Sequence, residues 1–426
     1  MIVAPSTQLR TLLLYAQDNQ GLGHITRTLT IARHLLARHP NCVAYIATKS
    51  PLAGFTLPER CDFIKLPILL HPPPCTSQWT VDQQKAAKQH LRKIRGQMLR
   101  DAALGLAPDL VLVDHEPLGS KGEFRDGLRA LKAERPATRF VCGLRDIQDD
   151  AARIRALWQE VGVYDAFENL YDGIAVYGSR TIYDVAEAYA IPPSVQPKLH
   201  YCGYIVRDPP AVDAGALRER NGWPKNGPMI VATVGSGYDG YPVLEAARAA
   251  VERLQERFPG LHAILVTGPF MPADKQARLQ AQATATCRVV SWADNFELLA
   301  AADAVVGMGG YNSVCEALVQ ARPLVIVPRA THKKVEQRIR AETLAAHGLA
   351  RWVHPKELTG ENLAQALEWA LGCDRKAHAR LVREIIPSFD GAARLTAYLS
   401  QWLGRNREDL GAAEPQSQSE LRIANS

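Results

Sequence analysis

The stretch 305–318 holds the residues best suited to bind a phosphorylated ligand. It runs from an apolar strand through Gly309 and Gly310 into a helix that carries Glu316. Glycines let a phosphate approach the backbone, and the start of a helix offers unpaired N–H groups at the positive end of its dipole. A carboxylate further along the same helix can accept hydroxyl protons from a ribose. This order predicts a site for a nucleoside diphosphate.

A second candidate for chemistry lies near the N-terminus, where residues 20–27 follow the first apolar strand and open the first helix. Its glycines, Gly23 among them, free the loop to pass close to a ligand. His24 stands at the start of the helix, and a histidine that is neutral near pH 7 can take a proton from a hydroxyl. A capping or packing histidine is the alternative interpretation. Asp114 ends a buried strand, and its alternative role is the N-cap of the next turn.

Length and composition indicate two domains and an anionic ligand. The 426 residues exceed the roughly 250–300 that one hydrophobic core supports. The formal charge of +6 is mildly basic, but it is not gathered into long Lys/Arg blocks, so nucleic acid is not an expected partner. The eight cysteines are scattered without a zinc spacing and are expected to be reduced. With no signal peptide or membrane span in the sequence, we expect a cytoplasmic protein.

The elements that must position these residues form two alternating strand–helix series. Such series build parallel sheets, so we expect an α/β protein with two doubly wound Rossmann-like domains facing each other across a cleft. A proline-bearing passage, 191–210, separates the two series. The expected organisation is an acceptor-binding domain over 1–202, a donor-binding domain over 203–386, a helix over 387–404 that crosses back to the first domain, and a disordered polar tail over 405–426.

Together, these motifs resemble the GT-B glycosyltransferases. Residues 290–350 look like the donor-nucleotide half of the MurG-like, family 28-type branch. They are also similar to the donor box of plant UDP-sugar transferases, in which Asn312-Ser313, Glu316 and Glu336-Gln337 occupy the matching places. The resemblance implies a GT-B fold and a nucleotide-sugar co-substrate, most simply a UDP-sugar, with no other cofactor and no metal. Glu336 and Gln337 would then read the hydroxyls of the transferred sugar.

The resemblance also assigns roles in the linker and the first domain. Residues 202–207 look like a segment of the MurG-like branch whose arginine reaches the phosphates, which makes Arg207 the best donor-phosphate cation. In plant-type enzymes the residue matching His24 is the general base, and an aspartate in the place of Asp114 orients it. In the MurG-like branch that histidine lies near the donor diphosphate, so the role of His24 stays open.

A Gly-Ser-Gly-Tyr-Asp-Gly run over residues 235–240 also fits the GxGxxG fingerprint of dinucleotide-binding domains. That fingerprint needs an acidic residue at the end of the next strand, which here ends in Val266-Thr267-Gly268. Tyr241-Pro242 is expected to delay the helix beyond the last glycine. We therefore interpret Gly235, Ser236 and Gly237 as a backbone loop beside the donor phosphates, as the resemblance implies.

The sequence thus predicts an inverting, metal-independent glycosyltransferase that acts on a small-molecule or lipid-linked acceptor. The loop 66–75 and the Lys/Arg-bearing helix 83–100 shape either a soluble-acceptor pocket or a peripheral contact with the inner membrane face. The sequence leaves the oligomeric state open. One alternative is a nucleotide-sugar hydrolase, because residues 21–30 resemble the UDP-sugar hydrolase of pseudaminic acid synthesis. The other is a non-catalytic protein that binds sugar nucleotides.

Overall fold

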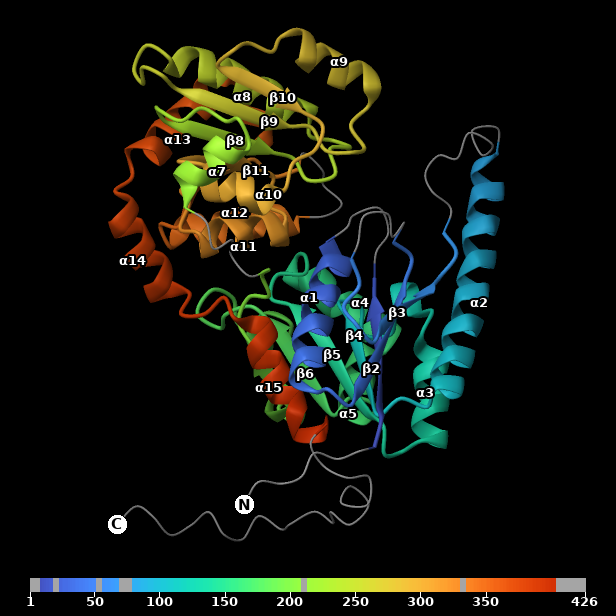
Figure 1. The fold of residues 1–426 in the computed structure, drawn as a ribbon. Coiled ribbons are helices and arrows are strands. Elements are labelled where there is room, and N and C mark those ends of the chain that lie inside the picture. The colour runs from blue at the N-terminus through green and yellow to red at the C-terminus, as the bar shows by residue number, and fades with distance from the viewer. Residues whose placement is uncertain are drawn as a thin grey trace, which may run out of the picture.

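The computed structural model describes residues 8–17, 23–50, 56–68, 79–207, 213–329 and 335–403. The chain forms two lobes that meet along one side of each (Figure 1). The expected tail over 405–426 lies outside the described residues, as do positions 20–22 of the first loop and 69–75 of the proline-bearing loop.

The N-terminal lobe is built on a seven-stranded parallel sheet in the order β3-β2-β1-β4-β5-β6-β7. The order reverses between β1 and β4, so the loops at their carboxyl ends diverge and leave a crevice. The strands are β1 (Arg10–Ala16), β2 (Cys42–Thr48), β3 (Cys61–Lys65), β4 (Leu110–Asp114), β5 (Arg139–Arg145), β6 (Gly173–Tyr177) and β7 (Leu199–Tyr201).

Helices cover both faces of this sheet, which explains why the central strands are apolar on both sides. Along β1, Leu12 and Leu14 belong to the core under α1 and α15, whereas Leu13 and Tyr15 belong to the core under α2 and α3. The helices of this lobe are α1 (Gly23–Arg38), α2 (Val81–Leu106), α3 (Arg125–Glu134), α4 (Ala151–Val161), α5 (Val163–Asn169) and α6 (Val185–Ala188).

The C-terminal lobe repeats the design with a six-stranded parallel sheet in the order β10-β9-β8-β11-β12-β13. Its order reverses between β8 and β11, which places a second crevice at their carboxyl ends. The strands are β8 (Met229–Thr233), β9 (His262–Val266), β10 (Cys287–Val290), β11 (Ala304–Gly307), β12 (Leu324–Ile326) and β13 (Ala350–Trp352). The helices are α7 (Ala214–Arg220), α8 (Tyr241–Leu254), α9 (Ala273–Ala281), α10 (Asn295–Ala301), α11 (Tyr311–Val319), α12 (Glu336–Ala346) and α13 (Gly360–Gly372).

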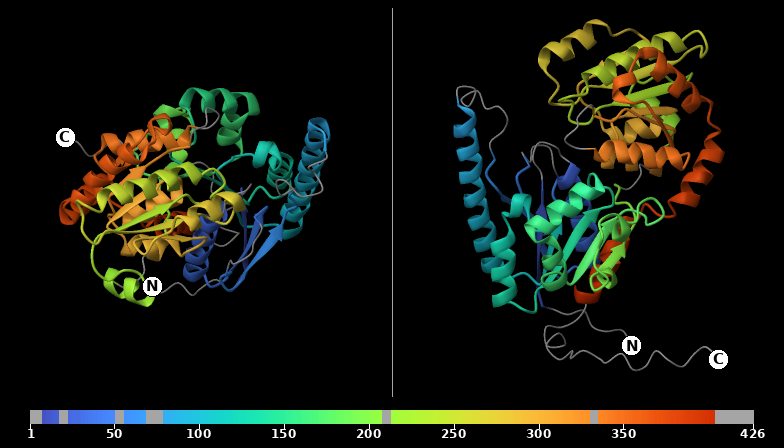
Figure 2. Two further views of the ribbon diagram at one scale, coloured as in Figure 1. Left: turned by 90° about the horizontal axis from the view of Figure 1, so that it is seen from above. Right: turned by 180° about the vertical axis from the view of Figure 1, so that it is seen from behind.

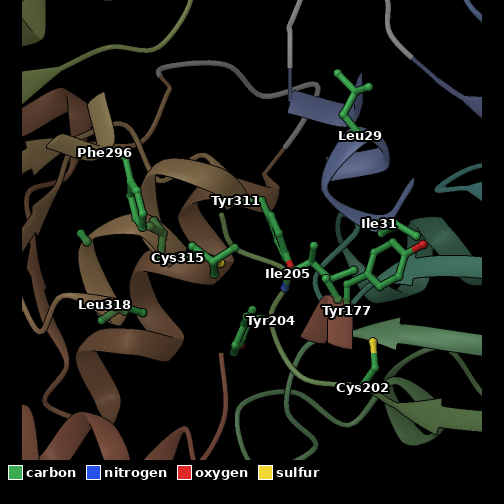
Figure 3. Close-up of a cluster of buried hydrophobic side chains, with 14 of the residues drawn as sticks. Leu29, Ile31, Tyr177, Cys202, Tyr204, Ile205, Phe296, Tyr311, Cys315 and Leu318 are labelled. Atoms are coloured by element: carbon green, nitrogen blue, oxygen red, sulfur yellow. The ribbon is translucent and has the colours of Figure 1, made fainter. Parts of the chain in front are cut away.

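Two segments join the lobes. The helix α14 (Arg375–Ile385) descends from the C-terminal lobe, and α15 (Gly391–Leu403) lies beside α1 on the N-terminal lobe (Figures 1 and 2). There His39 Nε2 lies 2.8 Å from Ser400 Oγ. The linker after β7 forms part of a buried cluster that reaches into both lobes (Figure 3), where the Ile205 N–H donates to the Tyr311 hydroxyl over 3.2 Å.

The expectation of two parallel-sheet Rossmann-like domains is confirmed. Two details differ. The short edge strand β3 was not expected, because its sequence is charged at both Asp62 and Lys65. The delay expected at Tyr241-Pro242 was wrong, since α8 begins at Tyr241 directly after Gly240. Proline fits the first turn of a helix, because its missing N–H has no partner to lose there.

Across the described ranges, no helix combines the length and the apolar character that crossing a bilayer requires.

Candidate active site

The first corner of the site forms where two neighbouring strands of the N-terminal sheet end. His24 lies in the first turn of α1, and Asp114 ends β4, which pairs with β1. Because β1 and β4 are neighbours in the parallel sheet, their carboxyl ends bring the two side chains together. His24 Nδ1 lies 2.6 Å from Asp114 Oδ2; the side chain of Asp114 is 1% exposed and that of His24 is 21% exposed.

Arg27 completes this corner, although sequence reasoning gave it no role. Its Nε donates to Asp114 Oδ1 over 3.0 Å, and its Nη2 lies 2.8 Å from both carboxylate oxygens. Burial acts to raise the pKa of Asp114, but Arg27 and His24 outweigh burial, so the pKa is lowered and the carboxylate stays ionised. The spacing in the sequence could have indicated this role. Residues three apart on a helix share a face, so the side chains of Arg27 and His24 had to lie on the same side of the first helix.

His24 is uncharged at neutral pH. Burial lowers the pKa of His24 to about 4, against the opposing effect of Asp114 and with the support of Arg27. An ionised carboxylate can only accept hydrogen bonds, so the contact with Asp114 assigns the proton to Nδ1 and the lone pair to Nε2. The imidazole is therefore in the form that can accept a proton.

Next to His24, a chain of contacts leads to the other lobe. The rings of His24 and His115 have centroids 5.0 Å apart. Arg145, at the end of β5, has its Nη2 3.3 Å from His115 Nε2 and donates to Glu336 Oε2 over 2.8 Å. Glu336, expected to read sugar hydroxyls, thus pairs with a cation of the opposite lobe. Its neighbour Gln337 accepts a hydrogen bond from the backbone of Arg329 over 3.0 Å.

The second corner of the site is the turn between β11 and α11. Gly309 has φ +79°, and a Cβ there would lie 3.0 Å from Ile326 Cγ2, so this position requires glycine. Gly310 is the N-cap of α11 and has no side-chain cap, and no atom lies within 4 Å of where its Cβ would stand. The buried Arg340 fixes the turn by donating to the Gly309 carbonyl over 2.6 Å. The start of α11 therefore presents open backbone, with Asn312 and Ser313 in its first turn.

A second glycine turn lies beside the first. β8 pairs with β11 through Thr233 and Gly307, so the loop after β8 is adjacent to the turn after β11. Gly235 has φ +62° and open space at its Cβ position, whereas a Cβ on Gly237 would lie 2.0 Å from the Thr267 carbonyl. The Ser236 carbonyl accepts from the Phe270 N–H over 2.8 Å, which holds the loop in place.

Arg207 and Glu316 form an ion pair at the side of this corner. Arg207 Nη2 lies 3.2 Å from Glu316 Oε1 and 3.2 Å from Asp294 Oδ1. Burial raises the pKa of Glu316 to about 7, while Arg207 opposes that effect. The predicted phosphate cation and the predicted ribose carboxylate are thus direct partners. Trp292, two residues before Asp294, is 72% exposed.

The two corners touch. Asn312 Nδ2 donates to the Gly23 carbonyl over 3.2 Å, and the Val335 N–H donates to Asp149 Oδ1 over 2.9 Å. Together with the Arg145–Glu336 pair, these contacts set the His24 corner of one lobe against the glycine turn before α11 of the other. Within the ranges that the structure describes, no three His, Cys, Asp or Glu side chains gather as a metal site would require.

Comparison with known proteins identifies the fold as GT-B. The glycotransferase of kitacinnamycin superposes with a TM-score of 0.65 at 18% identity, covering 93% of this chain and 100% of that one. UGT2 of Phytolacca americana, solved with UDP-2-fluoro-glucose and pterostilbene, gives a TM-score of 0.62 at 14% identity over 92% and 100%. MurG of Acinetobacter baumannii gives 0.57 at 14% identity over 92% and 99%. The expected GT-B fold is confirmed.

The C-terminal lobe has a family assignment of its own. Residues 229–379 match the glycosyltransferase family 28 C-terminal domain, which confirms the family 28 resemblance for this lobe. An uncharacterised glycosyltransferase of Methanopyrus kandleri is 24% identical over 204 residues, covering 45% of this chain and 55% of the relative. The match thus spans about half the length of that relative.

Proposed function

We propose that this protein is an inverting glycosyltransferase that moves a sugar from a nucleotide-diphosphate sugar to an acceptor hydroxyl. One observation carries the proposal: the loop that holds the neutral His24 meets the glycine turn of a family 28 domain, where the Asn312–Gly23 hydrogen bond of 3.2 Å joins the two corners. A base next to a diphosphate site suits a reaction that removes a proton on one side and releases a diphosphate on the other.

The donor we propose is a UDP-sugar. Glu316 would accept ribose hydroxyl protons, and the exposed Trp292 nearby offers a ring on which a base can stack. Gly235, Gly310 and the first turn of α11 would face the diphosphate, because their surroundings are open. The plant enzyme with this fold holds UDP-2-fluoro-glucose, which supports the nucleotide but not a particular sugar.

The reaction would proceed as a single displacement at the anomeric carbon. His24 Nε2 takes the proton of the acceptor hydroxyl, whose oxygen forms the new bond to the anomeric carbon from the face opposite the diphosphate. The bond from that carbon to the phosphate oxygen breaks, and the nucleoside diphosphate leaves with the electron pair. The N–H groups at the start of α11 and Arg207 would stabilise the charge that develops on the leaving phosphate, in place of a metal.

For the acceptor we propose a lipid-linked molecule held at a membrane surface. The helix α2 projects along the side of the N-terminal lobe (Figure 1), and its stretch 81–94 exposes Lys85, Lys88 and Lys93 together with Val81 and Ile94. Cationic and apolar side chains on one exposed helix suit an anionic lipid surface. Sedimentation with vesicles of anionic lipid tests this surface: binding should weaken in Ile94→Ser and in high salt, and equal retention of the wild type and Ile94→Ser by neutral vesicles would contradict it.

The alternative with support in the sequence is a nucleotide-sugar hydrolase, because the loop of His24 resembles that of such an enzyme. In a transferase, donor alone should release nucleoside diphosphate slowly, and the correct acceptor should accelerate release, because a bound hydroxyl gains the advantage of orientation over bulk water. A coupled assay for free nucleoside diphosphate, run with and without acceptor or lipid extract, tests this. Rapid, saturable release that no acceptor changes would establish the hydrolase instead, and binding without any turnover would leave a non-catalytic protein.

A further inference from the structure

Arg27 occupies the point where the base, its carboxylate and the donor lobe meet. Its side chain is buried, and besides Asp114 it lies 3.0 Å from His24 Nδ1. The Arg27 guanidinium also stands 5.2 Å from the ring centre of Tyr177 and 5.2 Å from that of Tyr311. Tyr177 ends β6 in the N-terminal lobe, whereas Tyr311 is the first residue of α11 (Figure 3). One cation therefore contacts both the proton-accepting corner and the start of the phosphate-binding helix.

The charges around His24 explain what this cation does. If Asp114 faced His24 alone in a buried site, its full negative charge would favour the protonated imidazole. Arg27 binds that carboxylate through Nε and Nη2, so the two charges cancel beside the ring. Arg145 also acts against a charged His24.

The other neighbours of the ring do not replace Arg27. The His115 ring lies 5.0 Å away, and Glu336 of the donor lobe is bound to Arg145. Tyr311 belongs to the donor lobe, so the position of the Arg27 side chain depends on how the two lobes meet.

We propose that Arg27 is a positioning residue for the transfer reaction. It neutralises Asp114 and holds His24 as the uncharged tautomer that accepts a proton. Through Tyr311, it links this protonation state to the position of α11. The inference rests on the proposed role of His24 as the base. The protonation state of His24 then depends on three side chains and on the contact between the lobes, and not on a His–Asp pair alone.

The direct test is the titration of His24 followed by NMR with ring-labelled histidine, the signal being assigned by its loss in His24→Gln. The wild-type ring should stay neutral down to about pH 5, since burial and Arg27 hold its pKa at about 4. In Arg27→Met the pKa of His24 should rise toward the ordinary value of about 6.5. In Arg27→Lys it should stay low, because the cation remains. Arg33→Met, an exposed position on the same helix, is the matched control and should titrate like wild type.

Arg27→Met leaves a buried, unpaired carboxylate and is therefore expected to be less stable. The double variant Arg27→Met/Asp114→Asn removes both charges and provides the second measurement. Its His24 should titrate as low as the wild type or lower, because burial then acts without an opposing anion. An unchanged His24 titration in Arg27→Met, or an equal rise in the double variant, would overturn the proposal.

Kinetics distinguish positioning from support of the fold. If the pKa of His24 rises by about 1.5 units in Arg27→Met, its neutral fraction at pH 5 falls about four-fold. The maximal transfer rate should fall in proportion at that pH and recover by pH 8, with the donor KM unchanged. A uniform loss at every pH, also seen in Arg27→Lys, would assign a purely structural role and overturn the proposal. Should no donor and acceptor react, the proposed function fails, whereas the titration still decides the role of Arg27.

Discussion

The two strand-to-helix corners of this protein have the same architecture and opposite contents. Each follows a strand beside the point where the strand order of its sheet reverses. The N-terminal corner is filled with charge: His24, Asp114 and Arg27 bond to one another and are largely buried. The C-terminal corner is open backbone, with space at Gly235 and Gly310.

Under the proposed function, this difference would divide the work of a group transfer between the two corners. A proton acceptor must be held in one tautomer and one charge state, which requires fixed neighbours. A diphosphate brings its own charge and several acceptor oxygens, so it needs unpaired N–H groups and room to approach.

The largest effect is expected from the charged corner. His24→Ala should lower turnover on the order of 10²–10⁴-fold while leaving nucleotide affinity nearly unchanged, because the base acts only on the acceptor proton. Steady-state kinetics and calorimetric titration with the nucleoside diphosphate measure the two quantities separately. His34→Gln, on the same helix, is the control. Equal losses of turnover and affinity would instead place His24 against the diphosphate.

The opposite result, a loss of nucleotide binding, is expected from the donor side. Glu316→Ala should remove most of the stabilisation that the correct nucleoside diphosphate gives, which is roughly 2.7 kcal/mol at 100 times the dissociation constant. A thermal-shift screen with UDP, dTDP, GDP and CMP measures it. An unchanged shift in Glu316→Ala, or no shift with any of the four nucleotides, would remove the donor site from this corner.

The glycines of the donor corner provide a matched pair of substitutions. Gly309 has φ +79° and a crowded Cβ position, whereas Gly310 has φ −64° and an empty one. Gly309→Ala should cost about 1–2 kcal/mol of unfolding free energy from the backbone alone, and it should weaken nucleotide binding by displacing α11. Gly310→Ala should fold like wild type and lose affinity only. Equal destabilisation of the two variants in chemical denaturation would show that neither the positive φ nor the crowding at Gly309 sets this turn.

Sequence reasoning reached each corner but not the contacts between them. Gly309, Gly310 and Glu316 share one local pattern, and the resemblance to plant-type transferases paired Asp114 with His24. Arg27 was missed although its spacing from His24 was visible, because a buried arginine has no local signature. Arg145 pairs with Glu336 across 191 positions, and that pairing depends on how the lobes dock, which no periodicity encodes. The Arg207–Glu316 pair joins residues 109 positions apart, and no local periodicity encodes such a contact.

A smaller effect is expected from pH, and again only one corner should respond. Burial raises the pKa of Glu316 to about 7, so the carboxylate goes from mostly protonated at pH 6 to mostly ionised at pH 8. Only the ionised form can accept both ribose hydroxyl protons, so nucleotide affinity should rise across this range, by about ten-fold at most. His24, with a pKa of about 4, stays neutral throughout. Because the terminal phosphate of the ligand itself titrates near pH 6, Glu316→Gln is the control; an equal rise in that variant would assign the whole effect to the ligand.

The smallest effect is expected from chelation. The open corner has a helix start, Arg207 and the buried Arg340 close to the turn that would receive the diphosphate. Partial and full positive charges of this kind can stabilise a leaving phosphate without a divalent ion. Transfer rates should therefore stay the same after EDTA treatment and after addition of Mg²⁺ or Mn²⁺. Loss of turnover on chelation, with recovery on adding either ion, would show that the open corner binds a metal–diphosphate complex. The contrast between a fixed proton acceptor and an open backbone site would then no longer hold.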